Sequence, residues 1–223
     1  MNIKQSIINT AKLTFEMESH AISNLSSLLD ENFADAVELI YNSKGRVVIT
    51  GIGKSAIIAN KIVATLNSTG TPSVFMHAAD AIHGDLGLIL EDDTVICISK
   101  SGNTPEIKVL VPLIKSAKNK MIAITGNIDS YLGVQSDYVL NAFVEKEACP
   151  NNLAPTTSTT AQLVIGDALA VCLLELRGFS KKDFAKYHPG GALGKRLYLR
   201  VNDLSSVNQK PKVTPVSYTH LTL

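Results

Sequence analysis

The sequence predicts an α/β protein: a three-layer α-β-α doubly wound sandwich around a five-stranded parallel sheet, preceded by a helical N-terminal lead-in. Three observations support this fold. Short β-branched apolar runs recur along the chain, stretches with helical spacing separate them, and glycine-rich or hydroxyl-rich loops follow several runs. Helical connections make successive strands parallel, and right-handed crossovers then place helices on both faces of the sheet.

The N-terminal lead-in is predicted to be helical. Over residues 3–29 the apolar positions follow one three-or-four repeat that only Glu18 interrupts, which indicates one long helix or two in tandem. A further helix is expected at 32–41. Such a lead-in packs either on its own sheet or on another subunit, and the sequence leaves both arrangements open.

The five apolar runs expected to be strands are residues 47–49, 73–76, 94–98, 121–124 and 138–140. Between them, helices are expected near 57–66, 104–117 and 129–132, with a loop or short helix at 78–82. In an open parallel sheet, ligands bind beyond the carboxyl ends of the strands. This rule selects four loops for a candidate site: 50–55, 77–85, 99–106 and 125–129.

A stretch at 159–177 is apolar on nearly every side, so we expect a helix buried in the core or between subunits. Gly178 is expected to end this helix. Ser180 with Asp183 resembles a capping box, which predicts one further short helix.

Length, charge and cysteine content limit the functional classes. We expect one domain over residues 1–204 and a mobile tail at 205–223. Residues 216–223 match no earlier pattern, which leaves open whether they are native sequence. A balance of 21 basic and 20 acidic residues disfavours bulk binding of nucleic acid or membrane. No apolar run is expected to reach the roughly 20 residues of a membrane span. With no signal-peptide core and three cysteines expected to be reduced, we predict a cytoplasmic protein.

The loop after the first strand has the composition of an anion site. Gly51 and Gly53 permit a tight turn, and the following helix start offers free N–H groups beside the Lys54 ammonium and the Ser55 hydroxyl. We interpret the anion as a phosphate on a small molecule.

Two other readings of this loop are disfavoured. A nucleotide-triphosphate P-loop needs its first glycine where Val48 stands, inside the strand. A dinucleotide site needs an acidic residue about 20 positions further on, and residues 71–73 offer none.

Two more hydroxyl-rich segments follow, at 99–106 and at 156–160, and each precedes a predicted helix. Helix-start amides and hydroxyls bind a phosphate monoester without arginine. One cluster alone is explained by helix capping, but three at sheet tips favour a binding site. The expected phosphate ligands are Gly53, Ser55, Ser99, Ser101, Gly102, Asn103, Thr104, Thr157 and Ser158.

Eight motifs over residues 30–204 resemble the sugar isomerase (SIS) domain family, with the closest similarity to arabinose-5-phosphate isomerases. They are Gly51-Ile-Gly-Lys-Ser55, Ser68-Thr-Gly-Thr-Pro72, His83-Gly-Asp-Leu-Gly87, Ser99-Lys-Ser-Gly102, Lys146-Glu-Ala-Cys-Pro150, Leu153-Ala-Pro-Thr-Thr-Ser158, Gly166-Asp-Ala-Leu-Ala170 and His188-Pro-Gly-Gly-Ala-Leu-Gly194.

The resemblance implies a flavodoxin-like strand order and a cofactor-free aldose–ketose isomerase, an intramolecular oxidoreductase. The family reaction interconverts D-ribulose 5-phosphate and D-arabinose 5-phosphate through an enediol, and supplies the precursor of Kdo for lipopolysaccharide or capsule. Larger relatives append CBS domains after a segment matching 201–204, and we expect none here. A homo-oligomer is expected, with a tetramer favoured over a dimer, and a downstream Kdo-nucleotide is an expected active-site inhibitor.

The residues support the same chemistry. Moving a carbonyl between C1 and C2 needs a base, a donor to the enediol oxygens and a group that opens the ring. Glu147 is predicted as the base, with its pKa raised by partial burial. His188 is predicted to open the ring or shuttle a proton, and Lys54 and Glu106 to align hydroxyls or stabilise the enediolate. The resemblance points to these four positions and to His83, supplied by a neighbouring subunit.

Two alternatives stay open: an isomerase of another phosphosugar, a hexose or heptose, and a non-catalytic phosphosugar sensor. Against the sensor, the first thirty residues lack the compact helix-turn-helix of a DNA reader. No cofactor and no obligatory metal are expected, because His83, Asp85 and Cys149 do not have the spacing of a structural metal site.

Overall fold

The computed structural model describes residues 2–191 of the 223-residue chain. The described residues fall into two units, divided between Phe179 and Ser180, and each is described by itself. The predicted domain end and the predicted tail at 205–223 lie outside the described residues and stay predictions.

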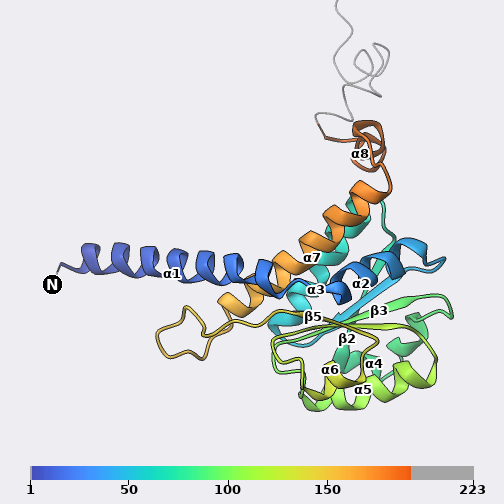
Figure 1. Ribbon diagram of the computed structural model, residues 1–223, viewed down its shortest axis with the longest axis horizontal. Coiled ribbons are helices and arrows are strands. Elements are labelled where there is room, and N and C mark those ends of the chain that lie inside the picture. Colours follow the sequence, from blue (N-terminus) through green and yellow to red (C-terminus); the bar gives the residue numbers. More distant parts are fainter. Residues whose placement is uncertain (1, 192–223) are drawn as a thin grey trace, which may run out of the picture. The chain divides into compact units, whose positions relative to one another are not determined.

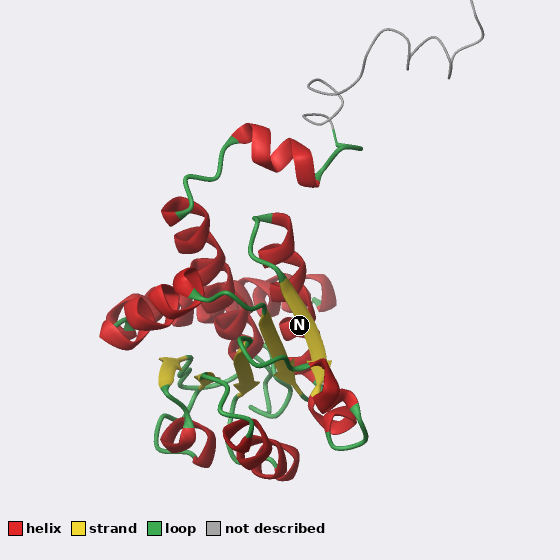
Figure 2. Ribbon diagram, turned by 90° about the vertical axis from the view of Figure 1, so that its right-hand side faces the viewer, coloured by secondary structure: helices red, strands yellow, loops and turns green. Residues whose placement is uncertain are grey.

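Five parallel strands form the predicted sheet, in the order β2-β1-β3-β4-β5. This is the flavodoxin-like order that the resemblance implied, and Figure 2 shows the strands in yellow. The strands are β1 (Val47–Gly51), β2 (Ser73–His77), β3 (Thr94–Ser99), β4 (Met121–Thr125) and β5 (Tyr138–Asn141). Each predicted strand is confirmed, with its carboxyl end one or two residues further along the chain.

Helices cover both faces of the sheet (Figure 1). On one face α1, α2, α3 and α7 enclose a core with the strands, and on the other α4, α5 and α6 enclose a second core. The helices of this unit are α1 (Ile3–Leu25), α2 (Glu31–Asn42), α3 (Lys54–Ser68), α4 (Ala78–Ala81), α5 (Pro105–Ser116), α6 (Tyr131–Gln135) and α7 (Thr157–Leu176), with 3₁₀ turns η1 (Ser26–Leu28) and η2 (Asp85–Leu88). The three-layer sandwich is therefore confirmed.

Strand residues alternate between the two cores. Ile49 and Ile96 face the first core, whereas Val48 and Cys97 face the second. Because both faces are covered, the strands read in sequence as continuous apolar runs. Cys97 has no exposed surface, and burial raises the pKa of its thiol to about 12.

The helix α7 is the stretch that the sequence predicted to be apolar on nearly every side. It contacts α1, α2 and α3, and it buries Ile165, Leu169 and Leu173 in the first core. Gly178 follows it with φ +59°, as a helix-ending residue does. By length and hydropathy alone α7 also matches a membrane span, so the expectation that no stretch does so is wrong by that measure. Its contacts make it a core helix of the sandwich.

Capping side chains set two helix ends. In the second unit, Ser180 and Asp183 form the predicted capping box at the start of α8 (Lys181–Tyr187). In the first unit, the helix predicted at 129–132 begins later, because the Ser130 hydroxyl caps it by accepting the backbone N–H of Gly133 (3.2 Å).

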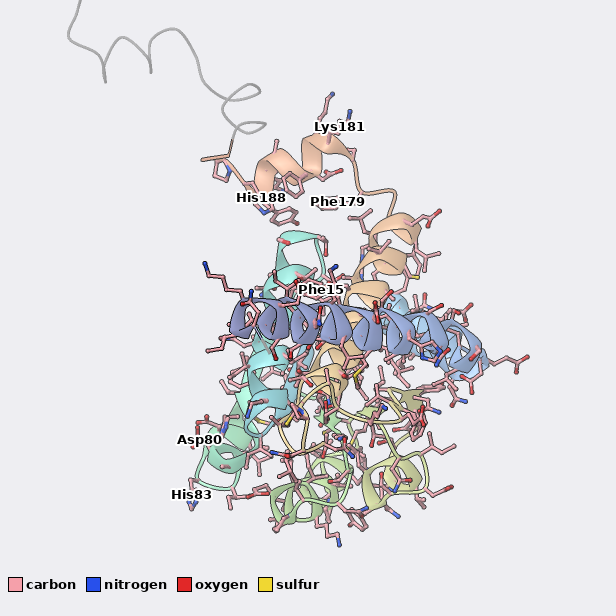
Figure 3. All side chains as sticks on the ribbon, turned by 90° about the vertical axis from the view of Figure 1, so that its left-hand side faces the viewer. Phe15, Asp80, His83, Phe179, Lys181 and His188 are labelled. Carbon is pink, nitrogen blue, oxygen red and sulfur yellow. The ribbon has the colours of Figure 1, made fainter. Side chains whose placement is uncertain are left out.

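The long helix α1 packs on its own chain only in part. In its C-terminal half, Thr160 donates to Glu18 (3.1 Å) and Leu25 is buried. Nearer the N-terminus, Ile3 and Phe15 are 76% and 72% exposed, and Figure 3 shows Phe15 on the outside of the helix. The lead-in thus leaves apolar side chains uncovered within this chain.

Asp93 ties the amino ends of β1 and β3 together. Its carboxylate, 1% exposed, accepts the backbone N–H of Arg46 (2.7 Å), the guanidinium Nη2 of Arg46 (2.8 Å) and the backbone N–H of Leu90 (3.0 Å). Burial alone would raise the pKa of Asp93, but the bonds from Arg46 and Leu90 outweigh it and hold the pKa below its ordinary value.

We expect Asp93→Ala to lower the free energy of unfolding by about 2–4 kcal/mol, because it leaves two backbone N–H groups without their acceptor and removes the counter-ion of the Arg46 guanidinium. Urea unfolding followed by circular dichroism measures the change. Asp92→Ala, at the exposed neighbouring position, is the control and is expected to stay within about 0.5 kcal/mol of the wild type. Equal effects of the two substitutions would contradict the role given to Asp93.

Candidate active site

Three separate segments meet in a cavity of about 320 Å³ at the carboxyl edge of the sheet. They are the loop after β1, the loop after β3 and the start of α7, the three hydroxyl-rich segments that the sequence singled out. The lining residues are Ile52, Lys54, Ser55, Ile98, Ser99, Lys100, Ser101, Thr104, Pro155, Ser158, Thr159 and Gln162.

The loop after β1 is shaped by its glycines. A Cβ at Gly51 would lie 3.1 Å from the carbonyl oxygen of Ile98, a contact so tight that β3 would have to move by a few tenths of an ångström. Gly53 has φ +59° and caps α3, whose first residue is Lys54. The Ser55 hydroxyl donates to the buried Gln162 on α7 (3.1 Å), which joins the first and third segments.

The loop after β3 is held in a tight turn. The Ser99 hydroxyl accepts the backbone N–H of Gly102 (3.1 Å), and Gly102 has φ +65°. A Cβ there would lie 2.0 Å from the Ser130 hydroxyl. The Thr104 hydroxyl lines the cavity, is buried and has no hydrogen-bond partner. A buried hydroxyl without a partner is costly, so Thr104 is suited to a ligand.

Two of the predicted phosphate ligands are used inside the fold instead. The Asn103 side chain accepts the backbone N–H of Tyr131 (3.1 Å), and the Thr157 hydroxyl accepts the backbone N–H of Ala148 (3.0 Å). Neither side chain lines the cavity, because each fastens its loop to a neighbouring segment.

Glu147 lies beside the cavity as a buried carboxylate at the start of α7. Its Oε1 accepts the Lys100 ammonium (2.6 Å) and the Ser158 hydroxyl (2.5 Å). Its Oε2 accepts the backbone N–H groups of Thr156 (2.8 Å) and Ser158 (3.1 Å). Glu147 therefore caps α7 with a negative charge at the positive end of the helix dipole.

The prediction of a raised pKa for Glu147 is wrong. Burial does raise the pKa of a carboxyl group, but the hydrogen bonds from Lys100, Ser158 and the backbone of Thr156 and Ser158 outweigh burial and lower the pKa to about 2. The sequence indicates the burial but not the partners, which come from segments far apart in the chain. Glu147 is consequently an anion at neutral pH.

This cap also decides where a phosphate fits. The helices α3, α5 and α7 begin beside this cavity, and the start of each attracts anions. Glu147 already occupies the start of α7. The starts of α3 and α5, with Ser55, Ser101 and Thr104, are left for a ligand.

Lys100 is the residue that the sequence analysis did not single out. It lies between two predicted phosphate ligands, Ser99 and Ser101, and lines the cavity while bonding to Glu147. Its position as a charged residue within a hydroxyl-rich loop is the one feature of the sequence that could have indicated a role for Lys100.

Within the first unit, the predicted catalytic residues Glu106 and His83 lie outside the cavity lining. Glu106 lies in the first turn of α5. His83 is exposed in the loop after α4, and Figure 3 shows it at the outer edge of that loop. His188 belongs to the second unit, where its ring stacks on Phe184 with the centroids 3.9 Å apart. Their catalytic roles stay predictions.

A larger hollow of about 630 Å³ lies between α1 and the segment after β5, lined among others by His20 and Phe143. None of the three hydroxyl-rich segments reaches it, so the smaller cavity fits the predicted chemistry better. Within residues 2–191, no group of three or more His, Cys, Asp or Glu side chains is arranged to hold a metal ion.

We expect the stabilisation by Glu147 to be lost in acid. The folded pKa of about 2 lies below the ordinary 4.5, so the stabilisation is complete above pH 4.5 and falls as the pH drops towards 2. Comparison of the wild type with Glu147→Gln by urea unfolding should show the difference shrinking by about 2 kcal/mol between pH 6 and pH 3. Glu145→Gln, at an exposed position, is the control. A difference that stays constant down to pH 3 would contradict the lowered pKa.

A model of the SIS domain family matches residues 39–172. Among curated proteins, the chain is 50% identical over 211 residues to arabinose 5-phosphate isomerase KdsD of Pseudomonas aeruginosa, covering 94% of this chain and 65% of that one. It is 50% identical over 199 residues to arabinose 5-phosphate isomerase KpsF of Escherichia coli O6:H1, covering 89% and 61%. The chain thus spans less than two thirds of the length of these relatives.

Solved structures agree with the sequence matches. An Escherichia coli CFT073 protein in complex with arabinose 5-phosphate superposes with a TM-score of 0.81 at 41% identity, covering 85% of this chain and all of that one. A putative phosphosugar isomerase involved in capsule formation from Bacteroides fragilis superposes with a TM-score of 0.78 at 39% identity, covering 83% and 98%. Since the family model spans more than half of its length, the chain belongs to the SIS domain family.

Proposed function

We propose that the protein is an aldose–ketose isomerase that interconverts D-ribulose 5-phosphate and D-arabinose 5-phosphate through an enediol. The observation that carries the proposal is the cavity where two free helix starts meet a buried carboxylate. Lys100 and Ser158, which line the cavity, both contact Oε1 of Glu147. Identity of about 50% to arabinose 5-phosphate isomerases supports this choice among phosphosugars.

The phosphate is proposed to lie at the starts of α3 and α5. Ser101 supplies a hydroxyl there, and Ser55 lines the cavity at the start of α3. The buried Thr104 hydroxyl, which has no partner in the protein, supplies a further donor to the phosphate. This placement directs the carbon chain towards the third segment and Glu147. Gly53, Ser99, Gly102 and Ser158 shape the same site.

Glu147 is proposed as the base, because it is an anion at neutral pH and lies beside the cavity. It takes the proton from C2 of arabinose 5-phosphate, the electrons of that C–H bond form the C1=C2 double bond, and the carbonyl electrons move to O1. A proton then passes from O2 to O1, and Glu147 returns its proton to C1. The product is ribulose 5-phosphate, and no redox cofactor takes part.

The other predicted residues keep their proposed roles. Lys54, which lines the cavity, and Glu106 align the sugar hydroxyls or stabilise the enediolate. His188 opens the sugar ring or moves the proton between the two oxygens. His83, exposed in this chain, is proposed to serve the cavity of a neighbouring subunit.

Assembly and cellular role follow as proposals. The uncovered N-terminal half of α1 and Val171 on α7, 60% exposed, support a homo-oligomer, with a tetramer favoured and a dimer possible. The product is proposed to feed Kdo synthesis for lipopolysaccharide or capsule in the cytoplasm. A Kdo-nucleotide, carrying a carboxylate and a phosphate, is proposed to compete for the same anion-binding loops.

We expect the purified protein to convert ribulose 5-phosphate into arabinose 5-phosphate without added metal or cofactor, as followed by ¹³C NMR of C1 and C2. Glu147→Gln, the matched variant, is expected to lose about 100-fold or more in kcat, which is typical of a removed general base.

Turnover of a hexose or heptose phosphate in place of ribulose 5-phosphate would overturn the substrate. Tight phosphosugar binding without turnover would favour the sensor instead. Full activity of Glu147→Gln would remove Glu147 as the base.

We expect Thr104→Val to raise the KM for arabinose 5-phosphate about tenfold with kcat within about threefold, because one hydrogen bond to a charged phosphate is lost. Steady-state kinetics measure both constants. Thr71→Val is the matched control, since the Thr71 hydroxyl is also buried without a partner but lies outside the cavity lining. Equal KM values for the two variants would place the phosphate elsewhere.

A further inference from the structure

We propose that Lys100 is a further catalytic residue of the isomerase, whose ammonium donates to the substrate oxygen that becomes negatively charged in the enediolate. The inference rests on the proposed function and adds a residue to it. Neither the sequence motifs nor the family match assigned Lys100 a role.

The geometry places Lys100 where the charge develops. Its Nζ lies 2.6 Å from Oε1 of Glu147, the proposed base, and its side chain lines the cavity. A substrate carbon close enough to give its proton to Glu147 therefore has its oxygens within reach of the same ammonium.

The two partners differ in exposure. The Lys100 side chain is 47% exposed, whereas that of Glu147 is 1% exposed. An ammonium carries three N–H donors, and the bond to Glu147 uses one. Lys100 is thus anchored at one side and able to donate into the cavity at the other.

The backbone of Lys100 is fixed as well. Its carbonyl oxygen accepts the backbone N–H of Gly126 (3.0 Å), which ties the loop after β3 to the end of β4. A donor on a fixed backbone with an anchored head group needs little reorganisation during the reaction.

The charge balance explains why an ion pair suits this step. When Glu147 takes the proton from C2, its negative charge disappears and a negative charge appears on O1 of the sugar. The Lys100 ammonium then loses its counter-ion on the protein and gains one on the substrate. The total charge in the site is unchanged, and the ammonium stays paired throughout the step. Lys100 favours the enediolate because its bond to the strongly basic O1 is stronger than its bond to the weakly basic Glu147 carboxylate.

The second lysine of the cavity is less suited to this role. Lys54 is the first residue of α3, so its ammonium lies at the positive end of a helix dipole and beside the proposed phosphate. Within the described part of the chain, Glu147 forms its ion pair with Lys100 and none with Lys54. Of the two roles proposed for Lys54, the structure therefore favours alignment of the sugar hydroxyls near the phosphate, and it assigns Lys100 to the enediolate.

Steady-state kinetics of the full chain with arabinose 5-phosphate test the inference, using Lys100→Met, Lys100→Gln and Lys100→Arg between pH 6 and pH 9. We expect Lys100→Met and Lys100→Gln each to lose about 100-fold in kcat with KM within about threefold, as for removal of one oxyanion donor. The loss should be the same at every pH in this range. Lys100→Arg keeps the positive charge, so its kcat should be about tenfold higher than that of the Met and Gln variants.

Lys108→Met, at an exposed position of α5, is the control for removal of a surface charge and should match the wild type. Thermal unfolding of each variant identifies any that fail to fold. If Lys100→Met does not fold, Lys100→Gln gives the same test.

Three results would overturn the inference: kcat of the Met and Gln variants within about threefold of the wild type, a rise in KM alone, or a loss that disappears as the pH rises to 9. The last result would mean that Lys100 only controls the charge of Glu147. If the wild type turned over neither pentose phosphate, the proposed function itself would be overturned. That result comes from the wild type alone and does not depend on the Lys100 variants.

Discussion

One buried carboxylate joins the parts of the molecule that matter for chemistry. Glu147 follows β5 in the chain, yet it bonds to Lys100 after β3 and to the first residues of α7. Without this anion the start of α7 would have unpaired N–H groups, and the ammonium of Lys100 would have no anchor. The shape of the cavity therefore depends on the charge of a single side chain.

The two edges of the sheet carry different tasks. At the amino edge, Asp93 and Arg46 form a paired, well-covered cluster that holds β1 and β3 in place. At the carboxyl edge, helix starts and loops leave a hydroxyl such as that of Thr104 without a partner. The Asp93 cluster holds the strands in place at one edge, while the loops at the other edge keep polar groups available to a ligand.

The sequence predicted the fold well and the site in part. Strands such as β1 and β3 are continuous apolar runs, and their parallel order follows from helical connections, so local pattern was sufficient. The meeting of the three hydroxyl-rich segments followed from the rule for carboxyl edges. The local pattern could not predict which side chains pair across the chain. Lys100 and Glu147 are 47 positions apart, and their bond helps to lower the pKa of Glu147, which the sequence had predicted to be raised. Asn103 and Thr157 likewise have the right chemistry but bond to backbone groups of neighbouring segments.

The burial of Cys97 has a consequence for handling the protein. Its thiol sits at the centre of the sheet with a pKa of about 12, so the reactive thiolate is essentially absent while the strands stay closed. Alkylating or oxidising reagents reach it only when the sheet opens. The rate at which a reagent modifies Cys97 therefore reports how often the central strands open.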